Sequence, residues 1–271
     1  MKKSIYLLLM LLILLGTTAQ AQNFLSQRIP TDEQSSFGLR YFRYLPPSEA
    51  VLDQSIINGV YDLNASVFLD GGWIIGGSIP LIYFGIEGGA ENEFSIGNIE
   101  IKGAKILGAD QNSMVSLNVY LPTAPDDSQA PVYGILTNLY EFAKYSPNQL
   151  TIRANYSYEL VTIENLIAGI EVGPQIFIPT QTNSFIEQQT EIILNYNFKL
   201  GYKINDLALF TELGSWTTFT EEGSFGDNSV HQLNLGFQMI NVPFQPGIFW
   251  SKILEEDFDG STLGLKFDFM F

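Results

Sequence analysis

The sequence predicts an all-β fold, an antiparallel up-and-down transmembrane β-barrel of about twelve strands. Three observations predict it: an export leader, long segments in which apolar and polar residues alternate, and a last strand that ends on an aromatic residue. After the leader, no apolar run reaches the roughly eighteen residues that a membrane-crossing helix needs. A chain that crosses a bilayer without such a helix must close into a barrel, because backbone polar groups in lipid have to be paired within the protein.

The first 21 residues have the pattern of a cleaved signal peptide. Two Lys residues precede an apolar run from Ile5 to Leu15, and the leader closes on Ala19-Gln20-Ala21. We therefore expect a signal peptide over residues 1–21, a periplasmic N-terminal segment over residues 22–34 and the barrel over residues 35–271. No Cys follows the expected cleavage site, which argues against a lipid anchor.

The chain of 271 residues contains no Cys and is strongly acidic. Without Cys, neither disulfides nor thiol chemistry can operate in the oxidising compartment to which the leader directs the chain. Removal of the two Lys of the leader leaves 11 basic side chains against 29 acidic ones, a net charge of −18. This excess argues against nucleic acid as a partner, because phosphate binding requires Lys and Arg.

Period-two alternation dominates the rest of the chain. Between residues 150 and 160, for example, Ile152, Ala154 and Tyr156 share one face, and polar side chains take the other. Such alternation, rich in aromatic and β-branched residues, is typical of strands. The segments are longer than the usual soluble strand and fit the roughly nine to eleven residues of a membrane strand. The twelve predicted strands span residues 35–44, 54–69, 72–85, 94–107, 112–122, 148–162, 165–178, 188–203, 206–217, 229–240, 244–254 and 261–271.

The connections between these strands alternate between long and short. Bacterial barrels have short periplasmic turns and longer outer loops, so this rhythm predicts that both termini face the periplasm. Pro80 and Pro246 interrupt the third and eleventh strands, where Pro is awkward in a paired ladder. The long connections are residues 45–53, 86–93, 123–147, 179–187, 218–228 and 255–260, and the short ones lie near 70–71, 108–111, 163–164, 204–205 and 241–243.

The polar faces of the strands are expected to line the lumen. They carry opposite charges, which we pair as Arg153 with Glu159, Glu191 with Lys199, and Lys266 with Asp268. The apolar faces are rich in Tyr and Phe near the strand ends, as in the aromatic girdles of membrane barrels. The alternative is a soluble barrel or sandwich with an aromatic core. The candidate lumen-lining residues are Asn98, Glu100, Lys102, Arg153, Glu159, Glu171, Glu191 and Lys199.

The last strand decides in favour of the membrane barrel. Five apolar side chains alternate along it, and the last of them ends the chain. The pattern resembles the C-terminal recognition signal of outer-membrane proteins, which the barrel-assembly machinery reads. The alternative is an ordinary amphipathic last strand. The residues of this candidate assembly signal are Leu263, Leu265, Phe267, Phe269 and Phe271.

The connection at 123–147 is much the longest. Within it Val132, Ile135, Leu136 and Leu139 recur at helical spacing. One interpretation is a lid or a helix that folds into the lumen and offers an apolar face to a hydrophobic ligand. The alternative is a short surface helix packed on the rim of the barrel.

Candidate catalytic and metal-binding residues are few. The only histidine, His231, lies two residues after Ser229, so a Ser–His pair is conceivable, but a structural His is the preferred interpretation. Acidic residues gather in the predicted outer loops, where Glu221-Glu222 is one example. No loop has the spaced acidic pattern of an EF-hand, so we predict no built metal site, no cofactor and no enzyme. The loop acids remain a hypothesis for divalent cations shared with lipopolysaccharide.

Two neighbouring stretches resemble a known family. Residues 96–105, which contain Gly97-Asn98-Ile99-Glu100, precede residues 117–123, which end in Leu121-Pro122-Thr123. They are similar to a transporter-like outer-membrane family of the phenol-degradation meta pathway, whose strands read Gly-Asp-Leu-x-Leu-x-x-Lys and Leu-Pro-Thr-Gly. This chain has Asn98 in place of the Asp and Ala124 in place of the last Gly. The resemblance implies passive uptake of small, apolar molecules.

Three functions follow from these observations. The first is a passive channel or transporter for small molecules in the outer membrane of a Gram-negative bacterium. The second is a barrel that transports nothing and binds a partner at the surface, and the third is an outer-membrane hydrolase. The expected partners are outer-membrane lipid and lipopolysaccharide, the barrel-assembly machinery and a small-molecule solute.

Overall fold

The computed structural model describes residues 33–47, 56–86, 92–108, 111–163, 165–181, 189–219, 229–256 and 258–271. The expected signal peptide, residues 1–21, lies outside the described residues. So does most of the expected N-terminal segment, of which only Glu33 and Gln34 are described.

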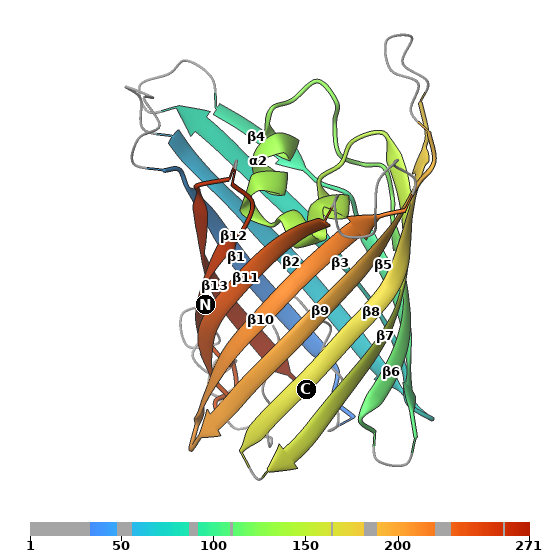
Figure 1. Cartoon of the computed structure of the whole chain (residues 1–271), viewed down its shortest axis with the longest axis vertical. Helices are drawn as coiled ribbons and strands as arrows, with labels where there is room; N and C mark the ends of the chain where they lie inside the picture. The colour runs from blue at the N-terminus through green and yellow to red at the C-terminus, as the bar shows by residue number, and fades with distance from the viewer. Residues whose placement is uncertain are drawn as a thin grey trace, which may run out of the picture.

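The described strands form one antiparallel sheet that closes on itself (Figure 1). Consecutive strands pair along the sheet, and β13 pairs with β1 to close the barrel. Both β4 and β5 pair with β3 and follow one another along it, so the wall is twelve strands around. The strands are β1 (Ser36–Leu45), β2 (Ile56–Leu69), β3 (Trp73–Ile86), β4 (Asn92–Ile96), β5 (Glu100–Leu107), β6 (Ser113–Tyr120), β7 (Gln149–Ile163), β8 (Leu166–Pro179), β9 (Glu191–Ile204), β10 (Leu207–Thr218), β11 (Ser229–Met239), β12 (Gly247–Ile253) and β13 (Ser261–Met270).

The predicted strands agree with the observed ones to within three residues at each outer end. The predicted strand 94–107 is wrong in one respect, because it is interrupted between Ile96 and Glu100. The register on β3 also changes there by one residue: Leu81 pairs with Ile96, whereas Ser78 pairs with Glu100. This extra residue is a β-bulge, a device that redirects a side chain and locally bends a strand.

Both prolines that made strands uncertain lie where a ladder hydrogen bond is not needed. Pro80 faces the bulge, where its carbonyl accepts a hydrogen bond from the N–H of Gly97 at 2.8 Å. Pro246 precedes β12, which begins at Gly247 rather than at residue 244. Both positions fit the rule that Pro in sheets is confined to edges, bulges and strand starts.

The two ends of the barrel differ. The turns at 70–72 and 205–206 lie at one end, and the segment between β6 and β7 lies at the other (Figure 1). Gly71 and Gly72 have φ values of 73° and 77°, which only glycine adopts readily, and they allow the tight turn from β2 to β3. The backbones of Ser35 and Phe271 exchange two hydrogen bonds of 3.0 Å at the short-turn end.

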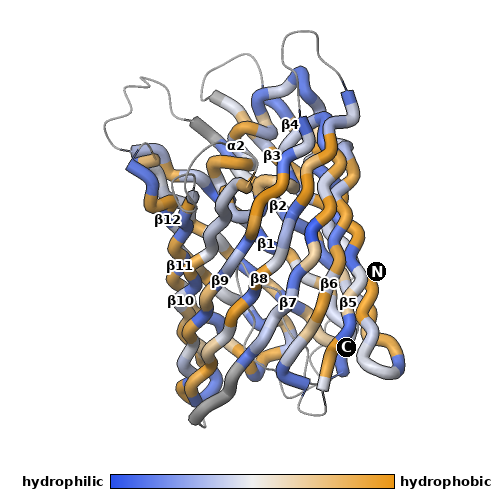
Figure 2. Tube along the Cα trace, turned by 45° about the vertical axis from the view of Figure 1, so that its right-hand side comes forward, coloured by the Kyte–Doolittle hydropathy of each residue, from blue (hydrophilic) through white to orange (hydrophobic). Residues whose placement is uncertain are grey.

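The polarity of the barrel is inverted relative to a soluble protein. Large apolar side chains on the outer face are exposed, such as Ile75 at 56% and Leu200 at 54%. The alternating inner positions bury polar and charged groups, including Asp62 and Asn197 at 0%. Figure 2 shows the alternation along the strands. Soluble proteins almost never bury this many polar groups, so the soluble alternative is wrong. In the ranges that the structure describes, no helix is long and apolar enough to cross a membrane.

Candidate functional site

A segment of the chain folds into the barrel. It comprises residues 121–148, between β6 and β7, and we call it the interior segment. It contains α2 (Ala130–Thr137) and a 3-10 helix η1 (Leu139–Lys144), which lie within the upper part of the barrel (Figure 1). The alternative of a helix packed on the outer rim is therefore wrong.

The helix also presents a different face from the predicted one. Val132 of the predicted apolar stripe is 55% exposed, whereas Pro131, Gly134 and Thr137 are buried. Gly134 is required here because a Cβ would collide with the ring of Tyr145. The segment packs on its own later residues, so the face is chosen by close contact rather than by apolar periodicity.

Asn98, the residue that the bulge turns inward, holds the interior segment by its backbone. Its side-chain amide donates to the carbonyls of Ala143 at 2.8 Å and Ser146 at 2.6 Å. Its Oδ1 accepts from the N–H of Ala124 at 2.9 Å, and its own N–H donates to the carbonyl of Lys144 at 2.6 Å. Asn98 is fully buried, so its amide satisfies backbone groups at both ends of the segment that would otherwise be unmatched.

Lys144 brings the only positive charge of the interior segment into a group of carboxylates. Its Nζ lies 2.9 Å from Asp62, 3.4 Å from Glu141 and 3.6 Å from Glu100. Burial alone would lower the pKa of Lys144, but the three carboxylates together raise it well above its usual value. Arg40 of β1 adds a second cation, 2.9 Å from Asp62. The ammonium is therefore paired, which a buried charge requires.

The other side of the interior segment reaches the opposite wall. The hydroxyl of Tyr140 accepts from Arg153 at 2.6 Å and donates to Glu171 at 3.3 Å. The N–H of Tyr140 donates to Gln232 of β11 at 2.9 Å. The ring of Phe142 lies 4.9 Å from that of Phe177 and 5.3 Å from that of Trp216. Because β2 and β5 are across the barrel from β8, β10 and β11, the interior segment spans the lumen.

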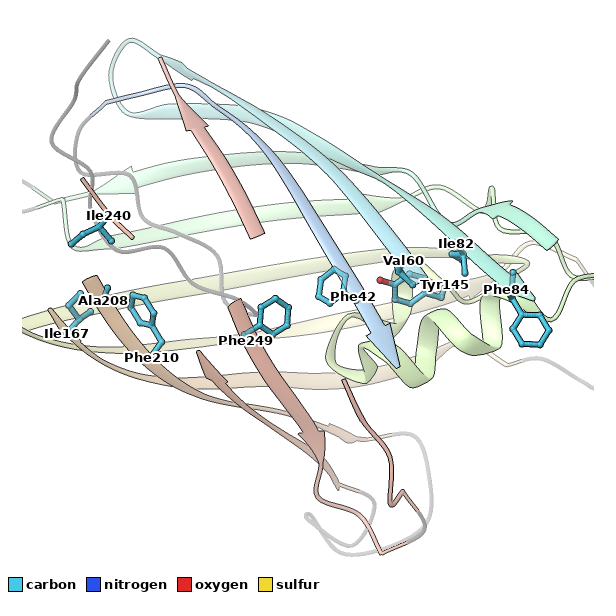
Figure 3. Close-up of a cluster of buried hydrophobic side chains, with 11 residues drawn as sticks. Phe42, Val60, Ile82, Phe84, Tyr145, Ile167, Ala208, Phe210, Ile240 and Phe249 are labelled. Carbon is cyan, nitrogen blue, oxygen red and sulfur yellow. The ribbon is translucent and has the colours of Figure 1, made fainter. Parts of the chain in front are cut away.

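Apolar contacts fix the upper part of the segment. Phe42, Val60 and Ile82 surround Tyr145, and Figure 3 shows this group beside the helix. Higher up, the ring of Tyr133 stacks on that of Phe84 at 4.0 Å. The segment thus combines an apolar upper part with a polar lower part.

Seven of the eight candidate lumen-lining residues are buried or half-buried on the inner wall, and the eighth, Glu191, is not buried. Glu191 begins β9 and is exposed. Two of the predicted ion pairs are wrong: Arg153 pairs with Glu171 at 3.0 Å, and Lys199 pairs with Glu159. Arg153 and Glu171 lie on the neighbouring strands β7 and β8. Glu159 of β7 and Lys199 of β9 meet across Gly169 of β8, which places no side chain between them. Only Lys266 and Asp268 pair as predicted, at 3.3 Å.

Comparison with solved structures shows which known proteins share the fold of this chain. No family model and no curated protein sequence matches the chain. A solved outer membrane channel of Pseudomonas putida F1, COG4313, has a TM-score of 0.59 at 11% identity, over 89% of this chain and 99% of that one. The chain has the fold of this channel. The NanC porin gives 0.54 at 10% identity, over 86% and 98% of the two chains. The KdgM porin, solved in complex with disordered oligogalacturonate, gives 0.51 at 9% identity, over 87% and 99%.

The single histidine has a serine partner that the sequence did not suggest. Nδ1 of His231 lies 2.8 Å from Oγ of Ser215, which faces it across β10 and β11, rather than from Ser229. Ser215 is 0% exposed, so its hydroxyl is not open to a substrate. In the part of the chain that the structure describes, no group of three or more His, Cys, Asp or Glu residues could hold a metal ion. The acidic pair Glu221-Glu222 lies outside the described residues.

The candidate assembly signal lies on the outer face of β13. Leu263 is 41% exposed, Leu265 is 39% exposed and Phe271 is 65% exposed. The ring of Phe269 lies 6.5 Å from that of Phe37 of β1, at the strand pair that closes the barrel.

Sequence reasoning missed the residues that matter most in the interior segment, Tyr140 and Lys144. One signal was present. Lys144 is the only basic residue between positions 121 and 148, and it stands beside an apolar run. A lone cation on a segment that faces an acidic lumen is a candidate ion-pair partner.

Proposed function

We propose that this protein is a passive channel for small molecules in the outer membrane of a Gram-negative bacterium, and that the interior segment closes it in the structure. One observation carries the proposal: a closed twelve-stranded barrel has an apolar outer face, a polar inner face and a piece of its own chain across the lumen. At twelve strands the interior is wider than in eight-stranded barrels that side chains alone can fill. The similar solved structures are called a channel and porins, which supports the same function.

We also propose a position for the barrel in the membrane. We place the short turns and both termini in the periplasm and the long connections outside, as bacterial barrels are arranged. Residues 1–21 would then be the leader that takes the chain there, and residues 22–34 would begin on the periplasmic side. The outer face would contact outer-membrane lipid, with lipopolysaccharide around the upper rim. Leu263, Leu265 and Phe271 would present the signal that the barrel-assembly machinery reads.

The lumen-lining residues would form the wall of the path. Arg153 with Glu171, and Lys199 with Glu159, are paired charges on the inner face. Glu100 approaches the ammonium of Lys144 at the interior segment. A solute that passes must therefore move the interior segment before it meets the lower lumen.

Liposome swelling tests the proposal. The refolded full-length chain is placed in liposomes and compared with a variant in which residues 123–147 are replaced by a short Gly-Ser linker. We expect slow swelling with the full chain and much faster swelling with the linker variant. An outcome in which neither protein admits any small solute, although both migrate as folded barrels, would refute a channel.

A second candidate function is a barrel that transports nothing and binds a partner at the cell surface. The closed lumen favours it, since the interior segment contacts both walls. Swelling with the linker variant but never with the full chain, in any solute, would favour this second function over the first.

A further inference from the structure

The inner wall opposite Asn98 carries an unusual set of unmatched polar atoms. Ten buried side-chain donor or acceptor atoms on five consecutive strands, β7 to β11, have no hydrogen-bond partner in the part of the chain that the structure describes, and seven of them are amide or indole atoms. These seven atoms belong to six residues that we call the amide wall: Asn155, Gln175, Asn195, Asn197, Trp216 and Asn234. Except for the ring of Trp216, which is half-buried, each of these side chains is at least 96% buried.

The residues of the amide wall are neighbours in the register. Asn195 pairs with Trp216, and Asn197 is separated from Gln232 by Gly214 alone. Gly173 likewise stands beside Asn195. The glycines place no side chain between the amides, so the unmatched atoms form one surface rather than isolated defects.

The opposite wall also has unmatched side-chain atoms, such as Oδ1 of Asp62 and Oγ of Ser116, but its buried asparagines are bonded. Asn58 exchanges two hydrogen bonds with the backbone of Tyr44. Asn98 is fully bonded, and Asn118 donates to Glu100 at 2.5 Å. Native proteins leave few buried polar groups unmatched, and a cluster of them points to something that the described residues do not supply. The interior segment bonds to both walls, through Asn98 on one and through Glu171 and Gln232 on the other, but it leaves the amides of the second wall unmatched.

The chemistry of the amide wall defines what it would bind. Amide groups offer donors and acceptors together, and the indole Nε1 offers one more donor. Both cations of this wall, Arg153 and Lys199, are already paired with carboxylates, so a charged solute would find no counter-charge there. An apolar solute would leave the amides unmatched, which costs desolvation free energy. A neutral solute with several hydroxyl groups satisfies them, because each hydroxyl both donates and accepts.

An aromatic surface lies at the upper edge of the same wall. Phe142 of the interior segment covers Trp216 at a ring distance of 5.3 Å. When the interior segment moves, the face of Trp216 becomes free for the apolar face of a sugar ring. Departure of the segment therefore frees Trp216, which pairs with Asn195 of the amide wall in the register.

We infer that the amide wall is a binding site for neutral, polyhydroxylated solutes such as oligosaccharides, exposed when the interior segment leaves it. The inference rests on the proposed channel function and deepens it. It differs from the apolar solutes that the sequence resemblance implies, because the unmatched atoms are polar.

Single-channel recordings in planar bilayers test the inference. The probe is raffinose, a neutral trisaccharide, and trigalacturonate serves as an acidic probe of the same length. All proteins carry Asn98→Ala, which releases the interior segment. The test variant adds Asn195→Leu and Asn197→Leu, which keep the branched shape of the side chains and remove the amides. The matched control adds Asn64→Leu, on β2 across the lumen. Heat-modifiable gel migration checks that each variant is folded.

We expect raffinose to interrupt the current, with a half-blocking concentration at least tenfold higher in the test variant and within twofold of the parent in the control. Trigalacturonate should interrupt the current less than raffinose does at equal concentration. Current without interruption by raffinose, or equal block in test and control variants, would overturn the amide wall and leave the channel intact. Folded protein that conducts no current in any variant would overturn the proposed function itself.

Discussion

Asn98→Ala is the sharpest test of how the lumen is closed. The substitution removes three hydrogen bonds from one fully buried side chain, to the carbonyls of Ala143 and Ser146 and from the N–H of Ala124. A net hydrogen bond contributes about 1 kcal/mol, and a buried group left unmatched costs about 1–3 kcal/mol. Water reaches these groups once the segment moves, so we take the lower figure for each bond.

The three bonds then stabilise the closed arrangement by about 3 kcal/mol, which corresponds to a shift of roughly a hundredfold in the equilibrium between closed and displaced segment. We expect the open probability in single-channel recordings to rise from rare events to a dominant open level. The bulge keeps its bond within the barrel wall, from the N–H of Gly97 to the carbonyl of Pro80, so the barrel itself should remain folded.

Asn58→Ala provides the matched control. Asn58 is also a buried Asn that bonds backbone groups, but both of its bonds go to Tyr44 within the barrel wall. We expect this variant to lower the thermal stability of the barrel without raising the open probability. Equal open probabilities for the two variants, or an unchanged open probability for Asn98→Ala in a folded barrel, would refute the assignment of Asn98 as the residue that holds the segment.

Three further predictions use other contacts of the structure. Lys144→Met removes the ammonium from beside Asp62 and its neighbours, and breaking a buried ion pair costs about 3–5 kcal/mol of stability. The variant should therefore raise the open probability even more than Asn98→Ala does; a smaller rise would show that the ion pairs add little to closure. The pKa of Lys144 is raised in the folded protein, so its contribution to the stability of the closed arrangement is complete below the ordinary Lys pKa and is lost only as the pH rises through the folded value. Wild-type conductance should therefore stay constant from about pH 6 to 9. A step in conductance inside that range would contradict the pairing. Gly97→Ala places a Cβ against the carbonyl of Lys144, which should destabilise the closed arrangement by about 1–3 kcal/mol and open the channel in the same recordings. An unchanged open probability would show that the bulge shifts to make room. Phe271→Ala should slow insertion by the purified assembly machinery several-fold and leave the melting temperature of the folded barrel unchanged, since Phe271 is 65% exposed; a large fall in melting temperature would assign it to folding stability instead.

The strands could be predicted because their signal is local. One residue follows another on alternate faces, so the pattern at residues 150–160 specifies a strand and its two faces without knowledge of the rest of the chain. The identity of the lumen side followed from the same pattern, since charges are tolerated only on the face away from lipid. The ion-pair predictions failed because they depend on contacts between strands that are distant in sequence. Arg153 and Lys199 pair with carboxylates on other strands, and those partners depend on the register between strands, which no stretch of a single strand reveals.

The bulge and the position of the interior segment were not predicted, for related reasons. The extra residue at Asn98 leaves no clear break in the alternation, and Gly97, a residue that often marks a bulge, was the one local sign of it. The apolar spacing of Val132 and Leu136 did predict a helix, but not on which side of the wall it would pack. That side is decided by Asn98 and Asp62, which are far from the helix in sequence, together with Tyr145 of the interior segment itself.

The unequal contacts of the interior segment imply a direction for its movement. On the β2–β5 side it exchanges hydrogen bonds with Asn98 and places Lys144 among carboxylates, and these contacts are lost entirely if the segment leaves. On the β7–β11 side Tyr140 bonds to the side chains of Arg153, Glu171 and Gln232, and Phe142 packs on two aromatic rings, but no charge of the segment is paired there. That wall also has unmatched polar atoms, which gain partners when water or a solute replaces the segment. The free energy of release is therefore lower on the second side. A segment that swings away from Trp216 while Asn98 keeps its hold opens the lumen along the amide wall, at the least cost in broken contacts and at the site where a hydroxylated solute gains the most.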